Sequence, residues 1–224
     1  MSIIIIDTDI EKIIDSLESN LSSIDRFTNE DNKYFDSYFE FVKYFERIET
    51  IDYHSLVISS YFTYGWMPTI LKNFDTENDV KKSIDIFNKV KNNIEIDNGE
   101  YYSLIKCINN SIVGVSKLLH FINPTQYPIF DSRIKNYFKN NNSLNLDSDK
   151  KHLIWKLTYQ NKNTEPLARK DIEQYKLYRY ICSQIIKNDR FNKIYIEAVE
   201  KLSVRGNLTE MRVLENMFFY FGKR

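Results

Sequence analysis

The stretch VSKLLHFINPTQYPIFDSRI, residues 115–134, joins an apolar helical segment to a loop and then to a second helix. Lys117 and His120 lie among the apolar residues of the first segment, and Asp131 comes directly before Ser-Arg-Ile. An aspartate at the start of a helix commonly caps it, because its carboxylate accepts hydrogen bonds from the first N–H groups. Two interpretations of Asp131 are therefore open: a helix cap or a catalytic carboxylate.

Apolar residues recur at helical spacing outside this stretch, for example over residues 10–21 and 34–45. The 224 residues include only 5 glycines and 4 prolines, whereas sandwiches and barrels need many turn residues. We therefore predict an all-α fold, one compact bilobal bundle of about ten helices over residues 1–224. Residues 2–6 fit either a short strand or an arm that caps the bundle.

Three local features predict how the bundle is organised. Residues 53–74 are apolar almost throughout, which predicts a buried helix that bends or breaks near Gly65 and Pro68. Residues 109–114 predict a bend between two helices, and Gly222 predicts the end of the last helix. The helices within residues 1–49 are expected to pack against the rest of the chain.

The composition argues against several classes of protein. Cys107 and Cys182 are far apart, so a disulfide framework, a cysteine zinc site and an iron–sulfur cluster are excluded. The three histidines form no cluster with carboxylates, and we expect neither a metal nor a cofactor. The apolar runs are too short for a signal peptide or a membrane span. These features predict a cytoplasmic monomer with no membrane partner.

Charge is distributed unevenly along a chain whose formal net charge is zero. Residues 1–60 contain 13 acidic and 5 basic residues, whereas residues 114–156 contain 7 Lys/Arg and 3 acidic residues. A basic face beside an acidic lobe binds phosphate groups even when the average charge is neutral. A chance fluctuation of surface charge explains the same counts, and both interpretations stay open.

The order of these motifs resembles the helix-hairpin-helix DNA glycosylase superfamily, which includes endonuclease III and the adenine and 8-oxoguanine DNA glycosylases. The resemblance extends over roughly residues 50–222 but is specific only over residues 113–134. The hairpin keeps one glycine, the separation between hairpin and aspartate is a few residues short, and the iron–sulfur cysteines of some members are missing. The matching residues are Val113-Gly114-Val115-Ser116-Lys117 for the hairpin, Leu118–Phe121 for the apolar helix and Pro128-Ile129-Phe130-Asp131 for the aspartate motif.

The resemblance implies an enzyme that hydrolyses the N-glycosidic bond of a damaged or modified base flipped out of duplex DNA. Asp131 would stabilise the positive charge that develops on the sugar. Lys117 would be a Schiff-base nucleophile or a phosphate contact, unless it is an ordinary solvated lysine. If Ser116 aligns with the family's lysine instead, water is the nucleophile.

The resemblance also implies a DNA-binding surface and a base pocket. Each of these residues has a plainer interpretation as well: His120 as a core residue, Arg133 and Lys135 as part of an exposed helix face, and the aromatic residues as core. The implied DNA contacts are Gly114, Val115, Ser116, His120, Arg133 and Lys135, and the implied pocket residues are Tyr61, Tyr64 and Trp66.

A different class of function fits the same sequence. A degenerate hairpin and zero net charge favour a non-catalytic module that binds nucleic acid or protein on the same helical scaffold. The sequence does not choose between this module and the enzyme, and it does not identify the base.

Overall fold

Ten α-helices and no β-strand lie in the described part of the chain, which confirms the all-α prediction. The computed structural model describes residues 7–24, 29–66, 70–72, 78–140, 165–202 and 206–222, so the strand considered at residues 2–6 lies outside it. In chain order the helices are α1 (Asp7–Leu21), α2 (Asn29–Arg47), α3 (Tyr53–Trp66), α4 (Asn78–Lys91), α5 (Asn98–Cys107), α6 (Ile112–Ile122), α7 (Ser132–Asn140), α9 (Glu165–Ile186), α10 (Asp189–Leu202) and α11 (Glu210–Phe221).

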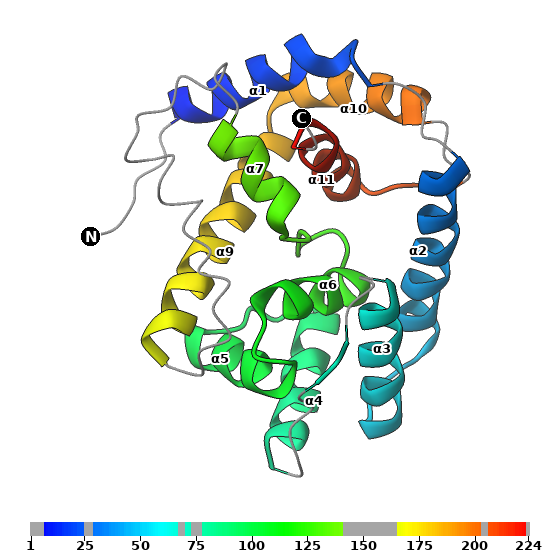
Figure 1. The fold of residues 1–224 in the computed structure, drawn as a ribbon, viewed down its shortest axis with the longest axis vertical. Helices are drawn as coiled ribbons and strands as arrows, with labels where there is room; N and C mark the ends of the chain where they lie inside the picture. Colours follow the sequence, from blue (N-terminus) through cyan, green and yellow to red (C-terminus); the bar gives the residue numbers. More distant parts are fainter. Residues whose placement is uncertain are drawn as a thin grey trace.

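The helices form two groups that share one core (Figure 1). Helices α2 to α6 pack with one another in the first group, and α1, α7, α10 and α11 form the second. Helix α9 joins the groups, because it contacts α5 and α6 in the first and α1, α10 and α11 in the second. This arrangement is the bilobal bundle that the sequence predicts, with the N-terminal helices packed against the rest.

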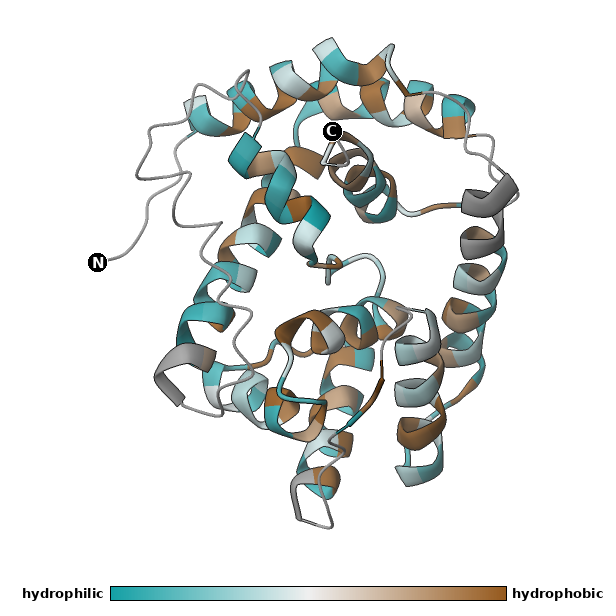
Figure 2. Cartoon of the chain, viewed as in Figure 1, coloured by the Kyte–Doolittle hydropathy of each residue, from teal (hydrophilic) through white to brown (hydrophobic). Residues whose placement is uncertain are grey.

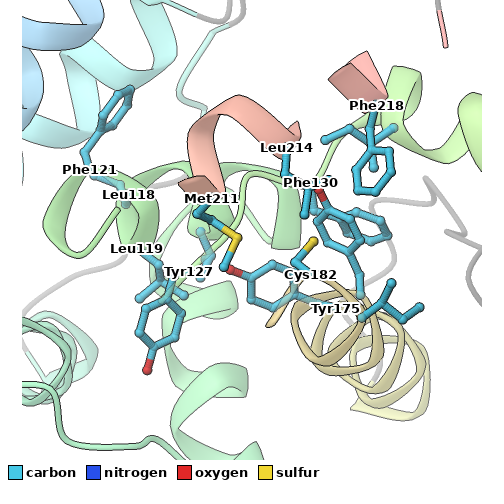
Figure 3. Packing of buried hydrophobic residues seen from close by; sticks show 14 of the residues in the cluster. Leu118, Leu119, Phe121, Tyr127, Phe130, Tyr175, Cys182, Met211, Leu214 and Phe218 are labelled. Atoms are coloured by element: carbon cyan, nitrogen blue, oxygen red, sulfur yellow. The ribbon is translucent and has the colours of Figure 1, made fainter. Parts of the chain in front are cut away.

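Helix α6 lies where the two groups meet, and its composition explains why. It is strongly hydrophobic (Figure 2), and ten of its eleven residues are buried. In Figure 3, Phe121 of α6 points away from α9, and its ring centroid lies 5.3 Å from that of Phe41 in α2 and 5.4 Å from that of Trp66 in α3. Phe130, in the loop after α6, stacks on Tyr178 of α9 with a centroid separation of 5.1 Å. The loop is therefore fixed against α9 as well as against α6.

The bend between α5 and α6 is shorter than predicted. Asn109 and Asn110 make the turn with φ angles of 56° and 51°, a left-handed conformation that asparagine tolerates. Ser111 then caps α6, because its hydroxyl accepts the Gly114 N–H at 3.3 Å. Helix α6 consequently begins at Ile112, and Gly114 belongs to its first turn and not to the bend.

Helix α3 is not fully buried, which corrects the prediction for residues 53–74. It ends at Trp66, next to Gly65 as expected, whereas Pro68 lies outside the described residues. Tyr53 and Tyr61 are exposed, and α3 lies at the edge of the bundle in Figure 1. An apolar composition without a clear polar face does not separate a surface helix from a core helix, because folded proteins expose much apolar surface.

Two glycines permit close approaches that position the central segment. A Cβ at Gly222, which ends α11 as predicted, would overlap the carbonyl oxygen of Arg133 in α7. A Cβ at Gly114 would overlap the Tyr64 hydroxyl and lie 2.9 Å from Cζ of that ring. The end of α11 can therefore touch α7, and Tyr64 can pack against the first turn of α6.

Gly114→Ala is expected to destabilise the protein by about 1–3 kcal/mol, the usual cost of overpacking a tight site. The buried Tyr64 ring must move to make room, and this outweighs the helix-propensity gain of roughly 1 kcal/mol. Gly65→Ala is the control, since a Cβ there meets nothing within 4 Å. Urea denaturation should show a loss for Gly114→Ala and no loss for Gly65→Ala; equal effects would contradict the close approach.

Candidate functional site

Asp131 is the N-cap of α7. Its Oδ1 accepts the N–H groups of Arg133 at 2.9 Å and Ile134 at 3.1 Å, which confirms the cap interpretation. The side chain is half-buried, and the cap uses one of its two carboxylate oxygens. Capping does not exclude catalysis, because a cap fixes the direction of a carboxylate that can still meet a ligand.

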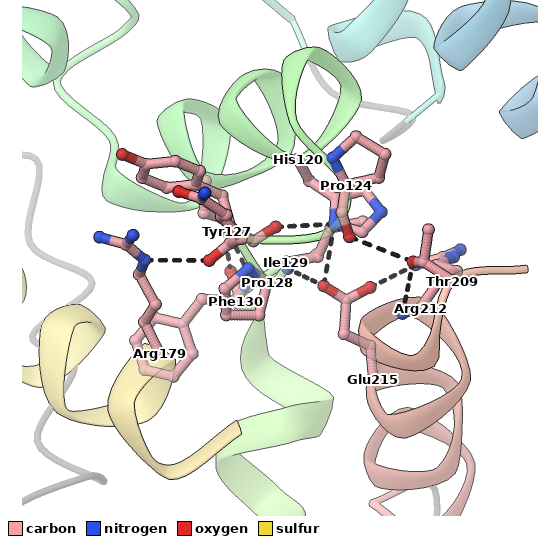
Figure 4. A network of polar contacts seen from close by, with 12 residues as sticks. His120, Pro124, Tyr127, Pro128, Ile129, Phe130, Arg179, Thr209, Arg212 and Glu215 are labelled. Atoms are coloured by element: carbon pink, nitrogen blue, oxygen red, sulfur yellow. Dashed lines mark hydrogen bonds and ion pairs between the residues drawn. The ribbon is translucent and has the colours of Figure 1, made fainter. Parts of the chain in front are cut away.

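The loop that leads into Asp131 is held by side chains from α6, α9 and α11 (Figure 4). The backbone groups of four consecutive loop residues each have a side-chain partner, so the position of Asp131 is set by three helices together. These contacts are His120 Nδ1 to the Tyr127 carbonyl at 2.7 Å, the Tyr175 hydroxyl to the Pro128 carbonyl at 3.0 Å, the Ile129 N–H to Glu215 Oε1, and the Phe130 N–H to Ser116 Oγ at 3.1 Å.

Lys117 is a buried lysine beside Trp66, and the charge of Asp131 acts on its amine. Its side chain projects from the middle of α6, the residue is 9% exposed, and Nζ lies 5.2 Å from the centroid of the Trp66 ring. The pKa of Lys117 is lowered to about 8, mainly because burial disfavours the charged amine; the carboxylate of Asp131 opposes this shift and Arg212 adds to it. Roughly one Lys117 amine in ten is then neutral at pH 7, so it can act as a nucleophile.

A buried ionic network lies next to this lysine, on α11 and α6. Arg212 Nη1 pairs with Glu215 Oε2 at 3.1 Å, and Glu215 Oε1 lies 3.1 Å from Nδ1 of His120. Nδ1 carries a proton, since its two partners are both acceptors, and Nε2 is hydrogen-bonded to the Tyr38 hydroxyl at 3.0 Å. The network connects α2, α6 and α11 around the loop before Asp131.

Of the three aromatic residues predicted for a base pocket, only Trp66 lies beside Lys117. It is half-buried, and the Arg212 guanidinium carbon is 5.6 Å from the centroid of its ring. Tyr64 is packed against Gly114, and burial raises its pKa to about 12. Tyr61 is 60% exposed on α3. The structure therefore brings one candidate stacking ring to the site and leaves Tyr64 as a packing residue.

The hairpin residues are buried, which corrects their predicted DNA contacts. The side chains of Val115, Ser116 and His120 have no exposed surface, so none of them can touch DNA in this conformation. Gly114 is buried as well, and the N–H groups of Gly114 and Val115 are both used by Ser111 in the cap of α6. His120 is thus a core histidine, and Ser116 ties α6 to Phe130 instead of facing a substrate.

The two basic residues predicted to bind DNA lie on α7 after Asp131. Arg133 is exposed, and its guanidinium carbon lies 4.4 Å from the centroid of the Phe219 ring. Lys135 is half-buried; burial lowers its pKa, and Lys139 lowers it further. Arg133 is close enough to act electrostatically on Lys117, so it lies on the same side of the molecule as the candidate site. Phosphate binding by these residues stays a prediction.

Arg212, Glu215 and Tyr38 lie at the candidate site but are not among the residues predicted from the sequence. Arg212 and Glu215 are three residues apart in EMRVLENMFFYF, a helix that is otherwise largely apolar. Two opposite charges at this spacing on a strongly apolar helix are a signal of a buried pair, because isolated charges are rarely buried. Tyr38 gives no such signal, since α2 contains many aromatic residues.

No protein-family model matches the sequence, and no curated protein or solved structure is significantly similar to it. The described residues contain no group of three histidine, cysteine or acidic side chains placed to hold a metal ion. No helix in the described ranges is long and apolar enough to cross a membrane. The glycosylase resemblance consequently depends on the residues between Val113 and Ile134 and on what the structure places around them.

Lys117→Met is expected to stabilise the protein near pH 7. The native pKa of Lys117 is about 8, below roughly 10.4 for an unfolded chain, so the native state binds fewer protons between these values. The free energy of unfolding of the wild type therefore rises as the pH increases from about 8 to about 10.4. Below about pH 8 the amine is charged in the folded protein, and burying this charge destabilises the fold to its full extent. Denaturation at pH 7 and pH 10 should show a gain for Lys117→Met that shrinks at the higher pH; a constant or growing gain would contradict the lowered pKa.

Proposed function

We propose that the protein is a DNA glycosylase that removes a damaged or modified base flipped out of DNA, with Lys117 and Asp131 at the reacting sugar. The observation that supports this most strongly is a buried amine of lowered pKa within electrostatic range of a carboxylate fixed at a helix N-terminus. The two groups come from neighbouring elements, α6 and the start of α7, and the intervening loop is held on three sides.

The chemistry needs one nucleophile and one anion. The neutral amine of Lys117 attacks C1′ of the deoxyribose, and the C1′–N bond breaks so that its electron pair leaves with the base. The base takes up a proton, which the amine loses as the new C–N bond forms. The carboxylate of Asp131 stabilises the positive charge on the sugar during this step.

The covalent intermediate then has two outcomes. The sugar ring opens to give a protonated Schiff base between Lys117 and C1′, and loss of a C2′ proton expels the 3′-phosphate and breaks the strand. Hydrolysis of the Schiff base by water returns the free amine. If water attacks C1′ in place of Lys117, the same cleavage leaves an intact strand with an abasic site.

The side chains around Lys117 fit the binding of an extruded base. The half-buried ring of Trp66, whose centroid lies 5.2 Å from the amine, is an aromatic group close to the proposed reaction, and bases outside the helical stack bind to aromatic side chains. Arg133, exposed on α7, would contact a phosphate next to the flipped nucleotide.

The test is a gel assay with labelled duplexes, each carrying one damaged or modified base, including substituted cytosines. We expect wild type to break the labelled strand of at least one substrate without alkali, and Lys117→Gln to lose these breaks. Lys43→Gln, a change of an exposed lysine on α2, is the control and should leave cleavage unchanged. Breaks that need alkali and persist in Lys117→Gln would establish the glycosylase but assign the attack to water.

A non-catalytic nucleic-acid-binding module is the second candidate. It is favoured by the zero formal net charge and by the use of the Gly114 and Val115 N–H groups inside the protein. DNA binding that weakens steeply with salt, together with no cleavage of any substrate, would support this module and contradict the enzyme.

A further inference from the structure

Two cations share the ring of Trp66. Lys117 Nζ lies 5.2 Å from the ring centroid, and the Arg212 guanidinium carbon lies 5.6 Å from it. Both residues are more than nine-tenths buried. Like charges brought together with little solvent oppose each other, and a guanidinium keeps its proton at every pH at which proteins fold. The lysine is therefore the member of this pair that can lose its charge.

Arg212 is held in this place by a buried partner. Its Nη1 pairs with Glu215 at 3.1 Å, and its guanidinium carbon lies 4.5 Å from the centroid of the Tyr38 ring. Glu215, 1% exposed, is itself fixed by His120 and by the N–H of Ile129. These contacts prevent the guanidinium from moving away from Trp66, so its charge acts on the lysine from a fixed position.

We propose that Arg212 and Glu215 are positioning residues of opposite effect on Lys117: Arg212 favours the neutral, nucleophilic amine, and Glu215 limits this effect while it fixes Arg212 against Trp66. The proposal rests on the proposed function for its biological meaning, because a neutral amine is what Schiff-base chemistry needs. The effect of the two residues on the protonation of Lys117, however, can be measured in the free protein without a substrate. Arg212 lowers the pKa of Lys117 and Glu215 raises it, in agreement with the geometry.

The other groups near Lys117 do not obscure its titration. Asp131 and Arg133, at the start of α7, act on the amine with opposite signs. His120 of α6 is bound to Tyr127 and Glu215. Five tyrosines on the helices packed against α6 have a pKa that burial raises, so their phenol groups are neutral while Lys117 titrates. They are Tyr38 of α2, Tyr64 of α3, Tyr101 of α5, and Tyr175 and Tyr178 of α9.

The experiment is a pH titration of lysine Cε signals by carbon-13 NMR on the full chain without DNA. The Lys117 signal is identified by its absence in Lys117→Arg. We expect Arg212→Met to raise the pKa of Lys117 above the wild-type value and Glu215→Gln to lower it below that value. Each pKa unit corresponds to a roughly tenfold change in the neutral fraction at pH 7. Arg212→Lys, which keeps the charge, should stay closer to wild type than Arg212→Met.

Opposite shifts from two residues in direct contact separate an electrostatic role from a structural one. Loss of structure would expose Lys117 in both variants and move both pKa values upward, towards the ordinary value. A rise in both, or no change in either, would overturn the proposal. If Arg212→Met does not fold, the double variant Arg212→Met/Glu215→Gln replaces it, and its pKa should lie above that of Glu215→Gln alone.

The result is independent of the assay for function. Opposite shifts without any cleavage of DNA would uphold the positioning role and refute the glycosylase. Cleavage by wild type without the pKa shifts would support the glycosylase and refute the positioning role. If both hold, the pH at which cleavage is half-maximal should move up in Arg212→Met and down in Glu215→Gln, in parallel with the pKa of Lys117.

Discussion

Asp131→Asn is expected to reduce base excision by about 100-fold or more while it leaves the fold intact. In the proposed reaction, the variant lacks the negative charge that stabilises the developing positive charge on the sugar, an electrostatic effect usually of this size or larger. The fold should survive, because asparagine caps a helix as well as aspartate does and can accept the N–H groups of Arg133 and Ile134. Excision is measured by the gel assay and stability by thermal unfolding.

Asp97→Asn is the matched control for this variant. Asp97 caps α5 as Asp131 caps α7, and its Oδ1 accepts the Glu100 N–H at 2.8 Å, but no observation connects it with Lys117. Both variants should melt close to wild type, and only Asp131→Asn should lose excision. Equal excision by the two variants would assign Asp131 to capping alone.

Glu215→Ala is expected to cost about 3–5 kcal/mol of stability, which is the usual result of removing one partner of a buried ion pair. The change leaves the charge of Arg212 buried without its carboxylate, and it removes the acceptor of the Ile129 N–H. For a chain of this length the loss corresponds to a fall in melting temperature of roughly 10 °C. Thermal unfolding followed by circular dichroism measures it.

Glu95→Ala provides the comparison, since Glu95 also pairs with an arginine but at the surface. Its carboxylate lies 2.5 Å from Arg179 Nη1 with a 61% exposed side chain, and such pairs contribute about 1 kcal/mol or less. Similar losses for both variants would mean that the network around Glu215 is not a buried pair in solution.

Much of the fold could be predicted from one sequence because helical periodicity is a local signal. Asp131 predicts the start of α7 from its position before Ser-Arg-Ile, and Gly222 predicts the end of α11. Gly114 predicts a bend because glycine is common in turns, whereas in the structure Ser111 caps α6 and the helix begins before this glycine. Local patterns predict most of the helices and their order along the chain. The predicted boundary of α6 is wrong because a glycine near a capping residue is compatible with either a bend or the first turn of a helix.

The candidate site could be predicted only in part, because its contacts join distant segments. Lys117 and Asp131 are close in sequence, and the stretch that contains them indicates both. The aromatic ring of Trp66 makes it a candidate from the sequence, but its contacts with Lys117 and Arg212 depend on how α3, α6 and α11 pack. The periodicity of apolar residues does not predict contacts between distant helices. It does not predict the burial of the polar residues His120 and Ser116 either.

The measurement that tests the central claim most directly is covalent trapping of the protein on DNA with borohydride. Wild type would be incubated with the duplexes and with a duplex containing an abasic site, reduced, and digested for peptide mapping by mass spectrometry. The account predicts a stable protein–DNA adduct whose modified residue is Lys117, absent in Lys117→Gln and present in Lys43→Gln. An adduct at another lysine, or no adduct with any of these duplexes, would contradict it.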